Sequence, residues 1–255
     1  MKVKAVILAG GEGSRLRPLT YYFQKCMIPI GPSQKPVLEY ILLHVKAHKI
    51  TKDIILLVGY KAEQIVNYFK NGRNLGFNIT YIHDSDKYKG TGGSLINAYR
   101  QGAVTENDTL LVYYGDIISN INLEDMLTQH LKDNADVTLA VSRRYQIPVG
   151  VVKIEGNRIY GIEEKPFMEI PVSIGIMFIN GNLLNRIAEL HKTQSMEKLD
   201  IMADILPRFI QQGFKIQAYT TDAFWYDVGS TERYEKLTSE LVQKHMGFLE
   251  SIADY

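Results

Sequence analysis

The chain has 255 residues, of which 45% are apolar and 22% charged, a composition typical of a globular protein with a full core and unlike that of a disordered chain. Its 29 Lys and Arg almost balance its 28 Asp and Glu, so no global field attracts nucleic acid or an anionic membrane, and a bound anion needs a local site. Cys26 is the single cysteine, so an internal disulfide is excluded. No apolar stretch approaches the roughly 18 residues of a membrane span, and none has the form of a signal peptide. We therefore expect a cytoplasmic protein.

The first half of the chain alternates between strand and helix patterns. Apolar and β-branched runs predict strands at residues 3–9, 53–59, 77–83 and 109–114. Apolar residues at helical spacing predict helices at residues 36–48, 61–70 and 92–102. This alternation predicts an α/β fold with a doubly wound, mostly parallel sheet and right-handed crossovers.

The pattern changes in the second half, where strand-like segments follow one another with little helix between them. They lie at residues 135–141, 150–154, 158–163 and 173–180, and we expect antiparallel additions that carry a substrate-binding face. Helical spacing returns at 181–190 and 201–212, before a strand at 214–220 and a closing helix at 231–244. No linker or repeat divides the chain, so we expect one domain, with the apolar tail at 246–255 packed within it.

A glycine-rich loop follows the first predicted strand, and Gly10, Gly11 and Gly13 are followed there by Arg15 and Arg17. Glycines let backbone N–H groups approach phosphate oxygens, and the carboxyl ends of parallel strands are the usual ligand sites. A tight turn with solvated arginines is the alternative interpretation. A Walker A loop is absent because no Gly-Lys-Ser or Gly-Lys-Thr occurs, and a dinucleotide fingerprint would need a third glycine. The loop therefore favours a more highly charged polyphosphate.

The loop is part of a longer motif, which reads Leu8-Ala9-Gly10-Gly11-Glu12-Gly13-Ser14-Arg15-Leu16-Arg17-Pro18-Leu19-Thr20 and continues with Lys25, Pro29 and Lys35-Pro36-Val37-Leu38. This motif closely resembles the opening of the sugar-1-phosphate nucleotidyltransferases, the enzymes that make nucleotide sugars. Four further segments resemble the family's later motifs in the same order: Thr91-Gly92-Gly93, Tyr114-Gly115-Asp116, Glu163-Glu164-Lys165-Pro166 and Phe224-Trp225-Tyr226-Asp227-Val228-Gly229-Ser230. The resemblance covers most of the chain and implies a Rossmann-like nucleotidyltransferase fold.

The resemblance also implies a division of the single domain and a reaction. Residues 1–120 would form the nucleotide-binding half, 121–230 the half that binds the sugar phosphate, and 231–255 a C-terminal helix and tail. A sugar-1-phosphate oxygen would attack the α-phosphorus of a nucleoside triphosphate and expel pyrophosphate. No general base is needed, because a phosphomonoester has a second pKa near 6 and is already ionised. Mg²⁺ would be the cofactor, held by Asp116 and Asp227.

The residues that match the family's motifs receive roles from the resemblance. The catalytic residues would be Arg15, Lys25, Asp116, Lys165 and Asp227. Nucleotide binding would involve Leu8, Ala9, Gly10, Gly11, Gly13, Ser14, Arg15, Lys25, Asp84, Thr91, Gly92, Gly115 and Asp116. Binding of the sugar phosphate would involve Gly150, Glu164, Lys165, Ser173 and Gly175. Taken alone, the aspartates would be turn residues and the Glu163-Glu164-Lys165 run a solvated surface.

The chain departs from the family pattern at two places that bear on the substrate. Ser173-Ile174-Gly175 stands where many members have Asn-Ala-Gly, and Gly90-Thr91-Gly92-Gly93 looks more like the guanylyltransferases that act on mannose- or heptose-1-phosphate. The sequence therefore favours a guanylyltransferase of this kind, and thymidylyl, uridylyl or cytidylyl transfer to glucose-1-phosphate stays an alternative. A non-catalytic sensor of nucleotide sugars is a second alternative. A nicotinamide-dependent oxidoreductase is a third, and only the glycine loop supports it. The expected partners are the two substrates, with no nucleic acid or membrane, and a homo-oligomer stays open.

Overall fold

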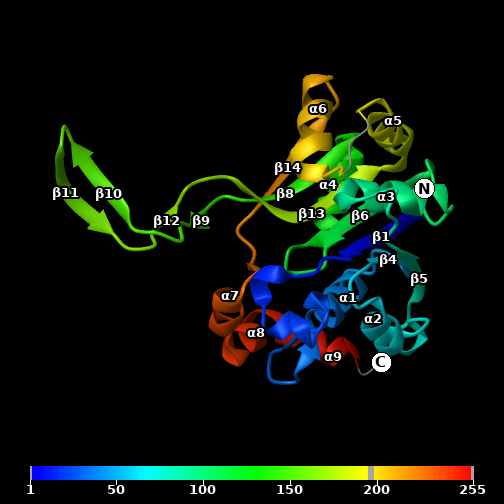
Figure 1. Ribbon diagram of the computed structural model, residues 1–255, viewed down its shortest axis with the longest axis horizontal. Helices are drawn as coiled ribbons and strands as arrows, with labels where there is room; N and C mark the ends of the chain where they lie inside the picture. The colour runs from blue at the N-terminus through cyan, green and yellow to red at the C-terminus, as the bar shows by residue number, and fades with distance from the viewer. Residues whose placement is uncertain (1, 195–197, 254–255) are drawn as a thin grey trace.

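The computed structural model describes residues 2–194 and 198–253 and has a mixed seven-stranded sheet at its centre (Figure 1). Its strands run in the order β14-β8-β13-β6-β1-β4-β5. Their bounds are Lys2–Ala9 (β1), Asp53–Val58 (β4), Asn78–His83 (β5), Asp108–Tyr114 (β6), Val137–Ser142 (β8), Val172–Asn180 (β13) and Ile216–Thr221 (β14). Only β13 runs antiparallel to its neighbours in this sheet, which confirms the mostly parallel α/β fold predicted from the sequence.

Helices cover both faces of the sheet. Their bounds are Val37–Ala47 (α1), Ala62–Phe69 (α2), Gly90–Arg100 (α3), Leu123–Lys132 (α4), Leu184–Gln194 (α5), Leu206–Gln211 (α6), Thr231–Lys236 (α7), Ser239–Met246 (α8) and Glu250–Ala253 (α9). Alternate residues of β1 enter two separate cores, since Ala5 and Ile7 pack on the side of α1 and α2, and Val6 packs on the side of α3 and α5. A strand buried on both faces explains the unbroken apolar run in the sequence.

Three helical segments differ from the expectation. The helix α4 was not expected, because its only buried side chains are Leu123, Met126 and His130. The closing helix is divided into α7 and α8, and Thr238 caps α8 by accepting a hydrogen bond from the backbone of Leu241. Residues 201–205 form a π-helical turn before α6.

The C-terminal tail packs within the chain, as expected. Leu249 is fully buried, α9 contacts α1, and the Lys46 ammonium donates to the carbonyl oxygen of Ile252 at 2.9 Å. Residues 254 and 255 lie outside the described part of the chain.

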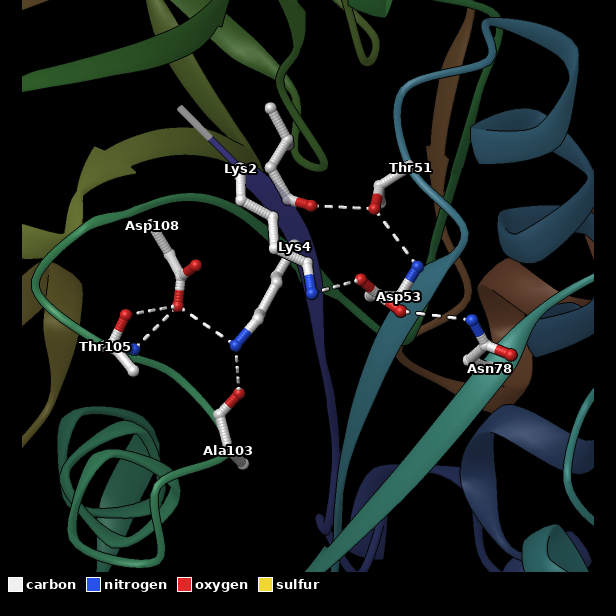
Figure 2. A network of polar contacts seen from close by, with 9 residues as sticks. Lys2, Lys4, Thr51, Asp53, Asn78, Ala103, Thr105 and Asp108 are labelled. Carbon is white, nitrogen blue, oxygen red and sulfur yellow. Dashed lines mark hydrogen bonds and ion pairs between the residues drawn. The ribbon is translucent and has the colours of Figure 1, made fainter.

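A polar network joins the amino-terminal ends of four sheet strands, β1, β4, β5 and β6 (Figure 2). The Lys4 ammonium lies 3.0 Å from an Asp108 carboxylate oxygen, which also accepts bonds from the backbone and hydroxyl of Thr105. On the neighbouring strand pair, the Lys2 ammonium lies 2.8 Å from a carboxylate oxygen of Asp53. Because these contacts occupy the amino end of the parallel strands, the carboxyl ends of β1, β4 and β6 lie together at the opposite edge.

An arm extends from the body of the molecule (Figure 1). At its base, β9 (Tyr145–Gln146) pairs with β12 (Phe167–Met168), and beyond them β10 (Val151–Glu155) pairs with β11 (Arg158–Glu163). The segments expected at 150–154 and 158–163 are thus strands, but they pair with each other and not with the central sheet.

Candidate functional site

A cavity of about 310 Å³ opens at the carboxyl ends of the parallel strands of the central sheet. It is bounded by the end of β1, the turn after it, the end of β6 and the first turn of α3. Seven of the predicted site residues line it, namely Leu8, Gly10, Gly11, Lys25, Asp84, Thr91 and Asp116. The lining also includes residues to which the sequence analysis assigned no role, namely Gln24, Cys26, Leu57, Gly90, Ser94, Tyr114, Lys198 and Asp200.

The glycine loop is packed closely against Asp84. A Cβ on Gly10 would lie 2.7 Å from an Asp84 carboxylate oxygen, and Gly13 has a φ of +62°. Gly11 has open space where a side chain would stand. The Asp84 carboxylate accepts a hydrogen bond from the Ser94 hydroxyl at 3.2 Å, and partial burial raises its pKa. A side chain at position 10 would therefore crowd the Asp84 carboxylate, and the backbone conformation at position 13 favours glycine.

Gln24 fixes the turn that carries Lys25. Its buried amide donates to the carbonyl oxygen of Ala9 at 2.7 Å, and its Oε1 accepts from the backbone of Cys26. These bonds hold the short turn Lys25–Met27 against the end of β1. The Lys25 ammonium then donates to the Asp116 carboxylate, and both side chains are largely buried. Gln24 is thus a positioning residue whose importance was not evident from the sequence.

Asp116 and Asp227 lie side by side although they are far apart in the sequence. Asp116 precedes the short strand β7 (Ile117–Ser119), which pairs antiparallel with β15 (Trp225–Asp227). The backbone N–H of Val228 donates to the carbonyl oxygen of Asp116 at 2.8 Å. The β7–β15 pair, a two-stranded sheet separate from the central one, therefore brings together the two aspartates proposed from the motifs.

The Asp227 carboxylate lies in an unusual electrostatic environment. Burial raises its pKa, the negative charge of Asp116 raises it further, and the charges of Arg233, Lys25 and Arg15 act in the opposite direction. Among the described residues, its Oδ1 is buried without a hydrogen-bond partner. Exposed Arg15 thus belongs to the same charged cluster, although it does not line the cavity.

A divalent cation fits these two side chains. Mg²⁺ prefers carboxylate oxygens and is commonly bound by one or two of them together with water and substrate phosphates. The unpartnered Oδ1 of Asp227 beside a second carboxylate is a donor set of this kind. The described part of the chain holds no cluster of three or more metal-binding side chains, so substrate and water would complete the coordination.

The Thr91-Gly92-Gly93 turn lies at the start of α3, and Thr91 lines the cavity together with Lys25. The Thr91 hydroxyl donates to an Asp200 carboxylate oxygen at 2.9 Å and accepts from the backbone of Ile201 at 2.9 Å. A Cβ on Gly92 would lie 2.6 Å from Ile205. The turn is therefore held by residues 199–205, which places Asp200 at the cavity wall.

The remaining predicted residues lie outside the cavity lining. Ala9 ends β1 and Gly13, Ser14 and Arg15 belong to the loop that follows it, while Gly92 and Gly115 are sequence neighbours of the lining residues Thr91 and Asp116. Gly175, with a φ of +73°, would place a Cβ 3.2 Å from Tyr114, and its N–H faces the Ser173 hydroxyl.

Gly150, Glu164 and Lys165 lie on the arm. The Glu164 carboxylate stands 3.0 Å from the position of a Cβ on Gly150, so these two residues are in contact. Lys165 has a positive φ of 47° and lies near the start of α7. The pKa of Glu232 there is lowered mainly by a hydrogen bond from Lys236 and further by the charge of Lys165.

The chain is similar to known proteins over most of its length. Residues 4–244 match the family model described as nucleotidyl transferase. A D-glycero-α-D-manno-heptose 1-phosphate guanylyltransferase from Aneurinibacillus thermoaerophilus is 31% identical over 242 residues, which cover 94% of this chain and 98% of that protein. A UTP–glucose-1-phosphate uridylyltransferase from Synechocystis sp. is 29% identical over 247 residues, and this chain spans 61% of its length.

A solved structure shares the fold. The crystal structure of a putative glucose-1-phosphate thymidylyltransferase from Bacillus anthracis, in complex with sucrose, superposes with a TM-score of 0.72. The match covers 94% of this chain and 95% of that chain at 22% sequence identity. Among the described residues, no helix has the length and apolar character needed to cross a membrane.

Proposed function

The chain belongs to the nucleotidyl transferase family, and from this premise we propose that it transfers a nucleotidyl group from a nucleoside triphosphate to a hexose-1-phosphate. The products are a nucleotide sugar and pyrophosphate. The observation that carries the proposal is the pairing of β7 with β15, which sets Asp227 beside Asp116, and Asp116 lines the cavity together with Gly10 and Gly11 of the glycine loop. Two carboxylates and a lysine close to such a loop suit the transfer of a charged nucleotidyl group with pyrophosphate as the leaving group.

The positive side chains reduce the repulsion between two anionic substrates. Lys25 reaches the cavity and binds the α-phosphate region, and Arg15 on the glycine loop holds the outer phosphates. Asp116 and Asp227 hold Mg²⁺, which neutralises charge on the phosphates when it is bound. Lys165 and Glu164 on the arm receive the sugar phosphate, together with Gly150, Ser173 and Gly175.

The chemistry requires no general base from the chain, because the attacking phosphate is already ionised near neutral pH. The histidines of the described chain are consistent with this mechanism, since none of them lines the cavity. His44 and His130 are hydrogen-bonded within the core, to the Ile121 carbonyl and to Thr138 respectively, and burial lowers the pKa of both. Both histidines are therefore neutral parts of the core.

We further propose that the nucleotide is GTP and the sugar a mannose- or heptose-1-phosphate. The heptose 1-phosphate guanylyltransferase is similar over nearly its whole length, which supports this preference. The closely packed Gly90-Thr91-Gly92-Gly93 turn at the cavity wall supports it as well, because it matches the guanylyl type of sequence.

Pyrophosphate release tests the proposal. The purified protein is incubated with Mg²⁺, each of five nucleoside triphosphates and a series of sugar-1-phosphates, and pyrophosphate is measured for every pair. We expect release that depends on both substrates and is highest with GTP and mannose- or heptose-1-phosphate. Absence of release from every pair, with nucleotide binding intact, would favour a sensor over an enzyme. Release with another base would refute the GTP preference alone.

A further inference from the structure

The β10–β11 hairpin has an apolar face that no described residue covers. Val152 stands opposite Ile162 and Ile154 stands opposite Ile159 in the hairpin register, and paired residues project to the same face. Each of these four side chains is between 43% and 70% exposed. A register shift between Lys153 and Ile154 leaves Tyr160 as the extra residue, which keeps all four aliphatic side chains on one face.

The hairpin has no other strand beside it. It forms a two-stranded sheet of its own, so among the described strands neither outer edge is paired. Figure 1 shows β10 and β11 at the far end of the arm, away from the central sheet and its helices. An isolated two-stranded hairpin is marginally stable in water. A contiguous face of four exposed aliphatic side chains on such a hairpin marks an interaction surface.

The charges at the two ends of β11 are opposite. Arg158 begins the strand and Glu163 ends it. If two copies pair antiparallel through β11, about a two-fold axis between Tyr160 and Gly161, then Arg158 of each copy faces Glu163 of the other. The same register sets Ile159 opposite Ile162 of the second copy, so the apolar faces of the two hairpins join into one.

The outer edge of β10 lacks this complementarity. Its central residue is Lys153, and two-fold antiparallel pairing about the centre of β10 (Val151–Glu155) would set Lys153 opposite itself. Like charges directly opposite each other destabilise a strand pair. Charge therefore selects β11 as the edge that meets a second copy.

We propose that the arm is a self-association surface, in which the β11 strands of two copies of this chain pair antiparallel and extend the hairpins into a four-stranded sheet. The aliphatic face of each hairpin then continues into that of the other copy, and the two charged ends of each β11 are neutralised. This surface lies on the same arm as Gly150, Glu164 and Lys165, which we propose to receive the sugar phosphate, but it uses none of these three residues.

Two charge reversals and their mixture test the proposal. The full chain and its variants are analysed by sedimentation velocity over a range of micromolar concentrations, with circular dichroism as a check on folding. The wild type should dimerise. Arg158→Glu alone and Glu163→Arg alone should each weaken self-association by at least about tenfold, because each sets two like-charged pairs across the axis. An equal mixture of the two variants should dimerise again, since each copy then faces opposite charges.

Lys153→Glu is the matched control. It changes the net charge by the same amount as Arg158→Glu, on the neighbouring strand, and should leave the dimer unchanged. A wild type that remains monomeric, as expected if the arm folds onto its own chain, overturns the proposal. So does a dimer that survives both single reversals, a mixture that fails to associate, or a control that dissociates as fully as Arg158→Glu.

Discussion

Asp227→Asn should have opposite effects on catalysis and on stability. The substitution keeps the shape of the side chain and removes its charge. In the folded chain this carboxylate is 27% exposed, lies beside Asp116, and has a buried oxygen without a partner among the described residues. A charge held in this way costs stability in the absence of substrate, so its removal should stabilise the free protein while activity is lost.

The structure allows a rough magnitude for both effects. A buried polar atom without a partner costs about 1–3 kcal/mol and more when it is charged; asparagine keeps the polar atom and removes only the cost of the charge. The ion pair between Arg233 Nε and Asp227 Oδ2, which lie 3.9 Å apart, offsets only part of this cost, since such ion pairs contribute about 0.2–1 kcal/mol. The bond from Arg233 to the backbone oxygen of Asp227 is unaffected. We therefore expect the free energy of unfolding to rise by about 1 kcal/mol, and the rate of pyrophosphate release to fall by roughly 10²–10³.

The pH dependence gives the sign of the stability effect independently. Because the pKa of Asp227 is raised in the folded state, the folded protein binds a proton more readily than the unfolded chain does. The penalty is therefore present at neutral pH and disappears as pH falls through the folded-state pKa. Urea unfolding of the two proteins should show the variant more stable at neutral pH, with the difference closing in acid.

Asp222→Asn serves as the control for this prediction. Asp222 lies nearby in the sequence, its side chain is 68% exposed, and it stands 3.8 Å from Arg143. Its substitution should change neither pyrophosphate release nor the pH dependence of unfolding. The reasoning is refuted if Asp227→Asn loses stability together with activity, as a purely structural aspartate would, or if it retains near-normal turnover with Mg²⁺.

Three further substitutions test other parts of the molecule. Lys165→Ala should raise the KM for the sugar phosphate more than that for the nucleotide in steady-state kinetics, and an effect confined to the nucleotide would contradict its assignment. Gly115→Ala should lower stability in urea unfolding by about 1–3 kcal/mol, because a Cβ would stand 2.7 Å from the Cys26 sulfur and equally close to backbone. Lys4→Met should cost about 3 kcal/mol by leaving the buried Asp108 carboxylate without its partner. The KM values of the Lys4→Met variant for both substrates should be unchanged, because Lys4 and Asp108 lie at the amino ends of the strands and the cavity lies at their carboxyl ends.

The central strands could be predicted from the sequence because they are buried on both sides. β1 and β6 read as unbroken apolar runs for that reason, and their boundaries agree with the structure to within one or two residues. α4 could not be found by the same signal, since few of its residues are buried and most of its surface is polar. In the structure, the Asn122 side chain caps this helix by accepting a bond from the backbone of Asp125.

The placement of the candidate site depended on contacts that no local pattern contains. Glycine-rich and aspartate-bearing segments at strand ends could be recognised in the sequence, and the structure brings several of them to one cavity. Gln24 and Asp200 could not be recognised, because their partners are the Ala9 carbonyl and the Thr91 hydroxyl, which become neighbours only in the folded chain. Residues such as Gln24 and Asp200, which position the site through contacts distant in the sequence, are therefore harder to predict than residues that belong to a sequence motif.

The proximity of the two aspartates is maintained by hydrogen bonds at the other end of the β7–β15 ladder. The Ser119 hydroxyl donates to the carbonyl oxygen of Phe224 at 2.8 Å, and the backbone of Phe224 donates to the Asn120 side chain at 2.8 Å. A ladder of three residues would not by itself hold two carboxylates together against their repulsion. These additional bonds offset that repulsion, so the chain keeps the two charges in place before any cation arrives, and a cation that binds there meets a preorganised pair.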